Sequence, residues 1–117
     1  MTEDRDSDAF AARWRAVLEA EIADLARARE ATRDDRAPVA LDQQSVGRLA
    51  RMDAMQMQAM AAASQVRRAQ REQRLREALG RLDAGEFGWC AECGEPIPEG
   101  RLKIDPTLAR CVTCAAG

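Results

Sequence analysis

The sequence predicts an all-α chain in which a long antiparallel helical hairpin (coiled coil) is followed by a small module that carries all four cysteines. Three observations predict this fold. Alanine and arginine, both good helix formers, account for 24 and 17 of the 117 residues. Leu, Ile, Val and Phe together number only 19, which is too few for a large compact core. Most of the glycines and prolines gather after residue 84, where the helical pattern ends.

The first helix is predicted from apolar residues that recur every three or four positions. We read residues 1–8 as a mobile acidic tail, because they lack any apolar periodicity. Asp8 is a candidate N-cap. The apolar residues that then share one side of a helix are Phe10, Trp14, Val17, Leu18, Ile22 and Leu25. The helix should stop near Pro38, because proline disfavours the helical conformation of the residue before it.

The second helix is expected to start at Asp42 or Gln43, with Asp42 as its cap, and to run to about Asp83. Its seam toward the first helix is predicted to contain the methionine cluster of residues 52–60 and, further on, Leu75, Leu79 and Leu82. A short connection makes the two helices antiparallel neighbours. The hairpin would therefore span residues 9–84, with its tip near 37–45, and Gly85 would cap its end.

The residues that are missing exclude several chemistries. The chain has no histidine, so it can build neither a Ser-His-Asp nor a Cys-His nucleophile, and no imidazole can bind a metal. No stretch is apolar enough to span a membrane, and the acidic first residues do not resemble a signal peptide. We therefore expect a cytoplasmic protein that is not an enzyme. In a reducing compartment, paired cysteines point to a metal rather than to disulfides.

The cysteines have the spacing of a zinc site. Cys90 and Cys93 form one CxxC pair, and Cys111 and Cys114 form a second after 17 intervening residues. Four thiolates complete a tetrahedron around one Zn²⁺ and leave no position for water, so the zinc should be structural. Gly94 fits the tight turn that follows the first pair. Residues 85–117 are thus predicted to be a zinc finger that folds only with its metal.

These residues also carry a family resemblance. The run GEFGWCAECG at 85–94, followed by Ile97, Arg101, Leu102, Pro106 and the second cysteine pair, resembles the finger of the DksA/TraR family of bacterial transcription regulators. The preceding hairpin is similar in layout. The resemblance implies direct binding to RNA polymerase, insertion of the coiled coil into the secondary channel, and control of initiation without recognition of a DNA sequence.

The resemblance also implies contact residues. Family members place two acidic residues three apart, followed by alanine, at the coiled-coil tip. Asp42 lies at the expected tip, but Ser45 stands where a second Asp would be, and Asp53 with Ala54 offers an alternative match. Basic residues near the base of the coiled coil bind guanosine tetraphosphate in some members, and Arg67 and Arg74 have similar positions. Asp105 precedes Pro106 where a cation would be expected, so we do not expect this nucleotide to act here.

Three functions remain open from the sequence. The first is a monomeric regulator that binds RNA polymerase, with a basic face made by Arg67, Arg71 and Arg74 as a contact surface. The second is a nucleic-acid-binding zinc module that uses the same arginines, although the chain lacks the exposed aromatic residues that stack on bases. The third is a redox sensor in which oxidation of the cysteine pairs ejects the zinc.

Overall fold

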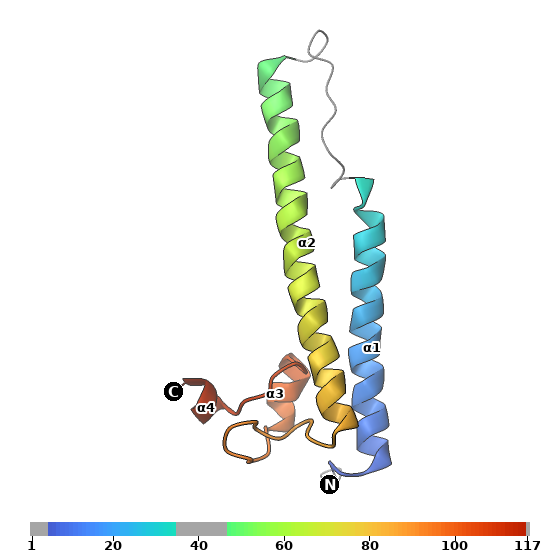
Figure 1. The fold of residues 1–117 in the computed structure, drawn as a ribbon, viewed down its shortest axis with the longest axis vertical. Helices are drawn as coiled ribbons and strands as arrows, with labels where there is room; N and C mark the ends of the chain where they lie inside the picture. The colour runs from blue at the N-terminus through green and yellow to red at the C-terminus, as the bar shows by residue number, and fades with distance from the viewer. Residues whose placement is uncertain (1–4, 35–46, 117) are drawn as a thin grey trace. The chain divides into compact units, whose positions relative to one another are not determined.

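The computed structural model describes residues 5–34 and 47–116. It contains the helices α1 (Asp8–Ala31), α2 (Arg48–Asp83), α3 (Glu99–Ile104) and α4 (Val112–Ala116) (Figure 1). The described residues contain no strand, only an isolated bridge between Trp89 and Pro96. The all-α prediction is therefore confirmed. The chain forms two compact units: residues 1–23 with 72–117 are unit 1, and residues 24–71 are unit 2.

Helix α1 begins at Asp8, the residue that was predicted to be its N-cap. The side-chain oxygen of Ser7 accepts a hydrogen bond from the backbone N–H of Phe10 at 3.1 Å, so Ser7 is the N-cap and Asp8 is already helical. The helix also ends earlier than predicted, at Ala31 rather than near Pro38. The backbone N–H of Arg33 bonds to the carbonyl of Glu30 at 3.3 Å. This bond joins residues three apart, as in a 3₁₀ helix, and closes the last turn.

Helix α2 is shorter than predicted at its start and ends where predicted. It begins at Arg48, after a non-helical Gly47, rather than at Asp42 or Gln43, which lie outside the described residues. At its other end, Gly85 has a φ of 75°. The N–H of Gly85 bonds to the carbonyl of Leu82 at 3.2 Å, and the N–H of Glu86 bonds to that of Arg81 at 2.8 Å. This pair of bonds is a Schellman motif, which confirms the predicted glycine cap.

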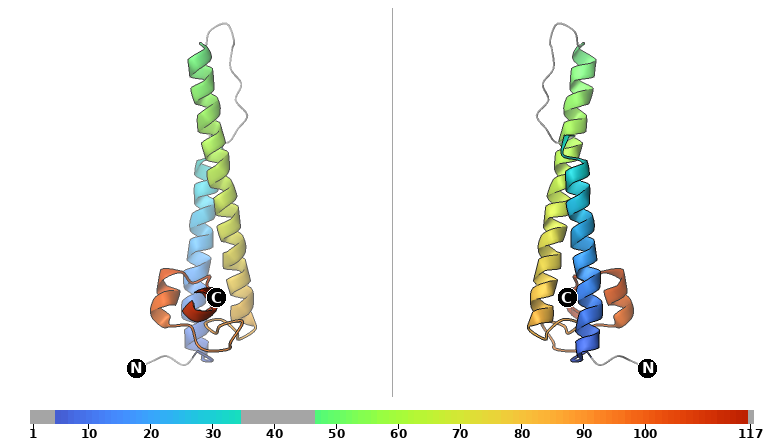
Figure 2. Two further views of the ribbon diagram at one scale, coloured as in Figure 1. Left: turned by 90° about the vertical axis from the view of Figure 1, so that its left-hand side faces the viewer. Right: turned by 90° about the vertical axis from the view of Figure 1, so that its right-hand side faces the viewer.

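Unit 1 contains the core of the protein. Within this unit, α1, α2 and the loop that leads to α3 come together (Figures 1 and 2). Three aromatic rings mark the centre: the centroid of Phe87 lies 6.1 Å from that of Phe10 and 5.5 Å from that of Trp14. The buried apolar residues of the two long helices and the finger are Phe10, Trp14, Leu18, Leu75, Ala78, Leu82, Phe87, Cys90, Ile97 and Leu102. The finger thus shares one core with the helices.

Unit 2 has a different construction. None of its described residues, 24–34 and 47–71, is buried. The predicted methionine seam is wrong, because Met52, Met55, Met57 and Met60 are 54–70% exposed. The half-buried side of α2 is instead formed by Arg51, Ala54, Gln58, Ala61 and other residues at coiled-coil spacing. Arg68 on this side donates a hydrogen bond to the hydroxyl of Thr32 at 3.2 Å. The half-buried side of α2 in unit 2 is therefore largely polar.

Among the described helices, none combines the length and the apolar character that a membrane crossing requires.

Candidate metal centre

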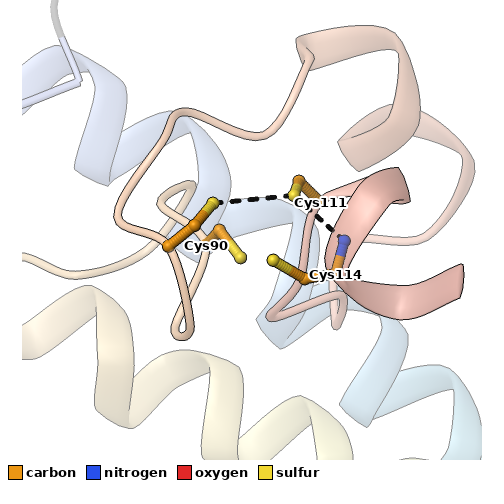
Figure 3. A group of neighbouring side chains, drawn as sticks. Cys90, Cys111 and Cys114 are labelled. Atoms are coloured by element: carbon orange, nitrogen blue, oxygen red, sulfur yellow. Dashed lines mark hydrogen bonds between the residues drawn. The ribbon is translucent and has the colours of Figure 1, made fainter. Parts of the chain in front are cut away.

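The four cysteines come together in unit 1. Their sulfur atoms all lie within 4.8 Å of one another, and none is in a disulfide. The sulfurs of Cys93 and Cys111 are 3.7 Å apart. Four sulfurs at about 2.3 Å from a tetrahedral zinc would be separated by about 3.8 Å. Figure 3 shows the side chains of Cys90, Cys111 and Cys114 around one common space. The spacing of the sulfurs therefore fits zinc.

The first pair of ligands sits in a tight turn. The backbone N–H of Cys90 bonds to the carbonyl of Glu95 at 2.8 Å, and the N–H of Gly94 bonds to the carbonyl of Cys90 at 2.9 Å. Gly94 closes the turn with a φ of 77°, a conformation that costs a side-chain-bearing residue about 1–2 kcal/mol. This is the tight turn that the sequence predicts after the first CxxC. It brings the Cys93 side chain back toward Cys90.

The second pair sits at the start of α4. The N–H of Ala115 bonds to the carbonyl of Cys111 at 2.9 Å, which places Cys111 just before the first helical turn. The N–H of Cys114 lies 3.5 Å from the sulfur of Cys111 and donates to it. A further backbone bond of 2.7 Å, from the N–H of Ala91 to the carbonyl of Ala109, joins the two halves of the finger. The second pair is thereby held opposite the first.

Hydrogen bonds within the site shift the pKa values of Cys90 and Cys114 in opposite directions. Backbone N–H groups of Cys93 and Cys111 lower the pKa of Cys90 to about 6, so its thiolate is favoured at neutral pH. In contrast, hydrogen bonds with the thiols of Cys111, Cys90 and Cys93 raise the pKa of Cys114. Four neighbouring thiolates therefore need a compensating cation, and a divalent ion with a preference for sulfur supplies it. Four protein ligands close the site, so its chemistry is structural rather than catalytic.

Comparisons with known proteins agree with this geometry. Residues 85–117 match the family model of the prokaryotic DksA/TraR C4-type zinc finger. The match covers the finger alone, which is 33 of the 117 residues. Among solved structures, the chain is similar to transcription factor DksA2 from Pseudomonas aeruginosa, with a TM-score of 0.77 and 24% sequence identity. The match covers 95% of this chain and 84% of that one, and it shows a shared fold. The comparison with curated proteins found no match.

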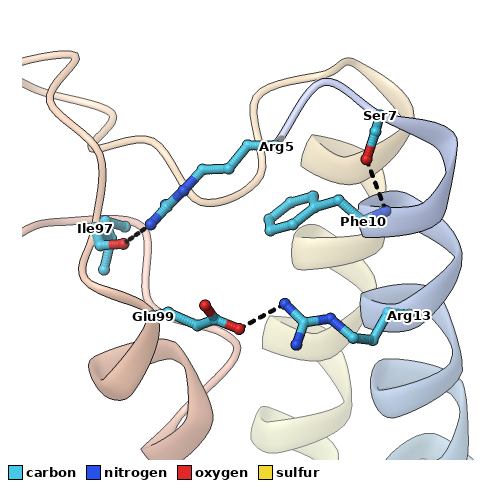
Figure 4. Close-up of polar contacts among 6 residues, drawn as sticks. All are labelled: Arg5, Ser7, Phe10, Arg13, Ile97 and Glu99. Carbon is cyan, nitrogen blue, oxygen red and sulfur yellow. Dashed lines mark hydrogen bonds and ion pairs between the residues drawn. The ribbon is translucent and has the colours of Figure 1, made fainter. Parts of the chain in front are cut away.

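The finger is held against the helices by residues that the sequence analysis did not single out. Arg5 donates a hydrogen bond to the carbonyl oxygen of Gly88. It donates a second, of 2.5 Å, to the carbonyl oxygen of Ile97 (Figure 4). Its guanidinium also lies 5.8 Å from the centre of the Trp89 ring. Arg13 forms an ion pair of 2.6 Å with Glu99 at the start of α3. Residues 5–8 are therefore part of the packed structure rather than of a mobile tail.

Asp105 has a local partner that explains an acidic residue at this position. Its carboxylate accepts a hydrogen bond from the backbone N–H of Thr107 at 3.0 Å and another from the Thr107 hydroxyl at 2.7 Å. Arg81 donates to the carbonyl of the same threonine at 3.0 Å. The burial of Arg81 lowers the pKa of its guanidinium. Asp105 thus fixes the turn that carries the chain through Pro106 toward the second cysteine pair.

The remaining predicted contact residues lie on α2 or outside the described residues. Asp42 and Ser45 lie outside the described residues. Asp53 and Ala54 lie on α2, where Asp53 is exposed and Ala54 is half-buried. Of the three arginines of the predicted basic face, Arg67 and Arg74 are exposed and Arg71 is half-buried. Arg67 donates to the hydroxyl of Ser64 at 2.9 Å. Their role as a contact surface remains a prediction.

Proposed function

We propose that this protein is a non-enzymatic, cytoplasmic transcription regulator that binds RNA polymerase directly. It would act as a monomer through the secondary channel and alter initiation without reading a DNA sequence. The observation that carries the proposal is the DksA/TraR finger, which shares its core with two long helices in a fold similar to that of transcription factor DksA2. A closed four-thiolate site offers no position for substrate, which favours a binding role.

In the proposed mechanism, unit 1 supplies the rigid part. The finger and the ends of α1 and α2 share the apolar core around Phe87 and the ion pair between Arg13 and Glu99. A preorganised surface of this kind loses little conformational entropy on binding. The basic face of Arg67, Arg71 and Arg74 would meet an acidic surface of the polymerase, and such contacts raise the association rate at low salt.

The acidic residues of the hairpin would act near the catalytic centre of the polymerase. Asp42 with Ser45, or Asp53 with Ala54, would approach the active-centre region and perturb its electrostatics. The exposure of Asp53 leaves its carboxylate accessible to a partner. Because Asp105 is already engaged by Thr107, we propose that guanosine tetraphosphate does not control this protein.

The proposal is tested by transcription in vitro with purified bacterial RNA polymerase on a ribosomal promoter. We expect the wild type to change the yield of transcript. Asp42→Ala or Asp53→Ala should remove this effect while leaving retention on immobilised polymerase intact. Gly80→Ala serves as a matched control, because a methyl group added there meets no atom within 4 Å. If the wild type changes no transcript and is not retained by polymerase, the proposal is wrong.

A parallel titration with free DNA separates this function from the nucleic-acid-binding alternative. Binding to phosphates releases counterions, so an affinity for DNA that falls steeply with salt would favour the alternative.

A further inference from the structure

Four of the five methionines lie within nine residues of α2, at positions 52, 55, 57 and 60. Their side chains are 54%, 55%, 70% and 63% exposed. The half-buried positions of the same turns are occupied by Arg51, Ala54, Gln58 and Ala61, so packing among the described residues of unit 2 does not explain the methionines. A methionine in a core is shielded from solvent, whereas these four thioethers are open to small reagents in water.

The methionines are also the most readily oxidised side chains in this part of the sequence. Residues 24–71 contain no cysteine, tryptophan, tyrosine or histidine. All four cysteines and both tryptophans belong to unit 1. A two-electron oxidant that reaches unit 2 therefore has one class of target there. This separation means that unit 2 and the zinc site can be oxidised and repaired by different chemistries.

We propose that Met52, Met55, Met57 and Met60 form a reversible oxidation site whose modification weakens the helix of unit 2. The oxidant is a hypohalous acid such as hypochlorous acid. Each thioether sulfur loses two electrons and gains one oxygen atom to become a sulfoxide, while the chlorine is reduced to chloride and one proton is released. A methionine sulfoxide reductase reverses the change, with one enzyme for each sulfoxide epimer.

The construction of unit 2 makes it sensitive to this change. None of its described residues is buried, and its seam leaves the Nε of Arg51 and the Oε1 of Gln65 without a hydrogen-bond partner among the described residues. The helix there depends on intrinsic propensity more than on a core. Unmodified methionine is among the better helix formers, because its straight side chain loses little freedom in a helix. A sulfoxide is branched at sulfur and adds a polar acceptor, so four of them should destabilise α2 locally.

Unit 1 is expected to keep its structure. Its buried apolar core and its zinc site do not include any of the four methionines. Oxidation would therefore loosen unit 2 and leave the finger folded. The regulatory consequence, which rests on the proposed function, is a reversible loss of the polymerase response under oxidative stress.

The first test uses the full zinc-loaded chain without polymerase. The protein is treated with hypochlorous acid and then with dithiothreitol and zinc, which restore thiols and metal but leave sulfoxides in place. Trypsin cleavage after Arg51 and Arg67 releases a single peptide, 52–67, that contains all four methionines. We expect this peptide to become about 64 Da heavier, one oxygen for each sulfur. The ellipticity at 222 nm should fall and should return after treatment with the reductases.

The matched control is the variant M52L/M55L/M57L/M60L, in which leucine keeps the helix propensity but cannot be oxidised. It retains every cysteine and tryptophan, so any loss of ellipticity shared by both proteins comes from side chains other than these four methionines. The proposal is overturned if peptide 52–67 gains no oxygen under conditions that oxidise free methionine. It is equally overturned if the sulfoxides form and the wild type loses no more ellipticity than the leucine variant.

A second test adds polymerase and separates the two proposals. Retention of the oxidised wild type on polymerase should fall and should recover after reductase treatment, while the leucine variant should be unaffected. Equal retention of oxidised and repaired protein would overturn the regulatory consequence. If the untreated chain does not bind polymerase, the proposed function fails, and the first test still decides whether the oxidation site exists.

Discussion

Replacing Gly88 with alanine is expected to destabilise unit 1 by about 2–4 kcal/mol. Gly88 has a φ of 89°, and this left-handed conformation costs a residue with a Cβ about 1–2 kcal/mol. The new methyl group would also lie 2.9 Å from Nη1 of Arg5 and 3.4 Å from the ring of Phe10. Arg5 would have to move, and the half-buried guanidinium would lose its bonds to the carbonyls of Gly88 and Ile97, worth about 1–2 kcal/mol together.

The assay is urea unfolding in excess zinc, followed by the fluorescence of Trp14 and Trp89, both of which lie in unit 1. Gly85→Ala is the matched control, because its φ of 75° is similar but a methyl group there meets no atom within 4 Å. Gly85→Ala should therefore lower the free energy of unfolding only by the cost of the left-handed backbone, about 1–2 kcal/mol.

A double-mutant cycle with Arg5→Ala isolates the contact itself. Because both substitutions remove the same interaction, their combined cost should be smaller than the sum of the single costs by about 1–2 kcal/mol. If Gly88→Ala costs no more than Gly85→Ala, and its effect adds fully to that of Arg5→Ala, the reasoning about Arg5 is refuted.

Three further predictions concern the metal, the core and the surface of α2. Removal of zinc by a chelator should change both the circular dichroism and the Trp89 fluorescence, and an unchanged signal would contradict a metal-organised finger. Phe87→Ala, which removes a ring that is 2% exposed, should lower the free energy of unfolding by about 3–5 kcal/mol in the same urea assay. Gly80→Ala should raise the free energy of unfolding by about 0.5–1 kcal/mol, because the position is helical and a methyl group there meets no atom within 4 Å. A loss of stability in this variant would contradict the helix assignment.

The metal site could be predicted from the sequence because its signals are local. The two CxxC pairs determine which sulfurs can bind one metal ion. Only the path of the chain between the two pairs depends on the rest of the fold. The positive φ values of Gly85 and Gly94 follow from the same kind of signal, a glycine at the end of a helix or after a cysteine pair. In the same way, the spacing of Phe10, Trp14 and Leu18 identified the buried side of α1, although Val17, predicted on the same side, is 42% exposed.

The orientation of α2 in unit 2 could not be predicted in this way. A helix turns by about 100° for each residue, so positions 51, 58 and 65 face differently from 52, 59 and 66. Hydrophobic periodicity favoured the side with Met52, whereas the structure half-buries the side with Arg51. With so few large apolar residues, the burial energies of the two sides differ too little for composition to decide between them.

The contact of Arg5 with the finger could not be predicted from the sequence for another reason. Arg5 is 83 and 92 residues from Gly88 and Ile97 in the chain, and its partners are backbone carbonyls. Every residue has a backbone carbonyl, so residue type does not indicate which carbonyls accept a hydrogen bond from a distant side chain. Only the tertiary fold brings this arginine to them, so the first residues read as an acidic tail.

The most direct test of the central claim is an equilibrium titration of core RNA polymerase into the fluorescently labelled, zinc-loaded chain. We expect saturable binding of one chain per polymerase, with a dissociation constant of about 1 μM or tighter, and competition by unlabelled protein. Zinc-depleted protein should bind more weakly, because the finger that completes the core of unit 1 is lost. A titration that shows no saturable binding by the folded, zinc-loaded chain would contradict the proposal that this protein acts on RNA polymerase.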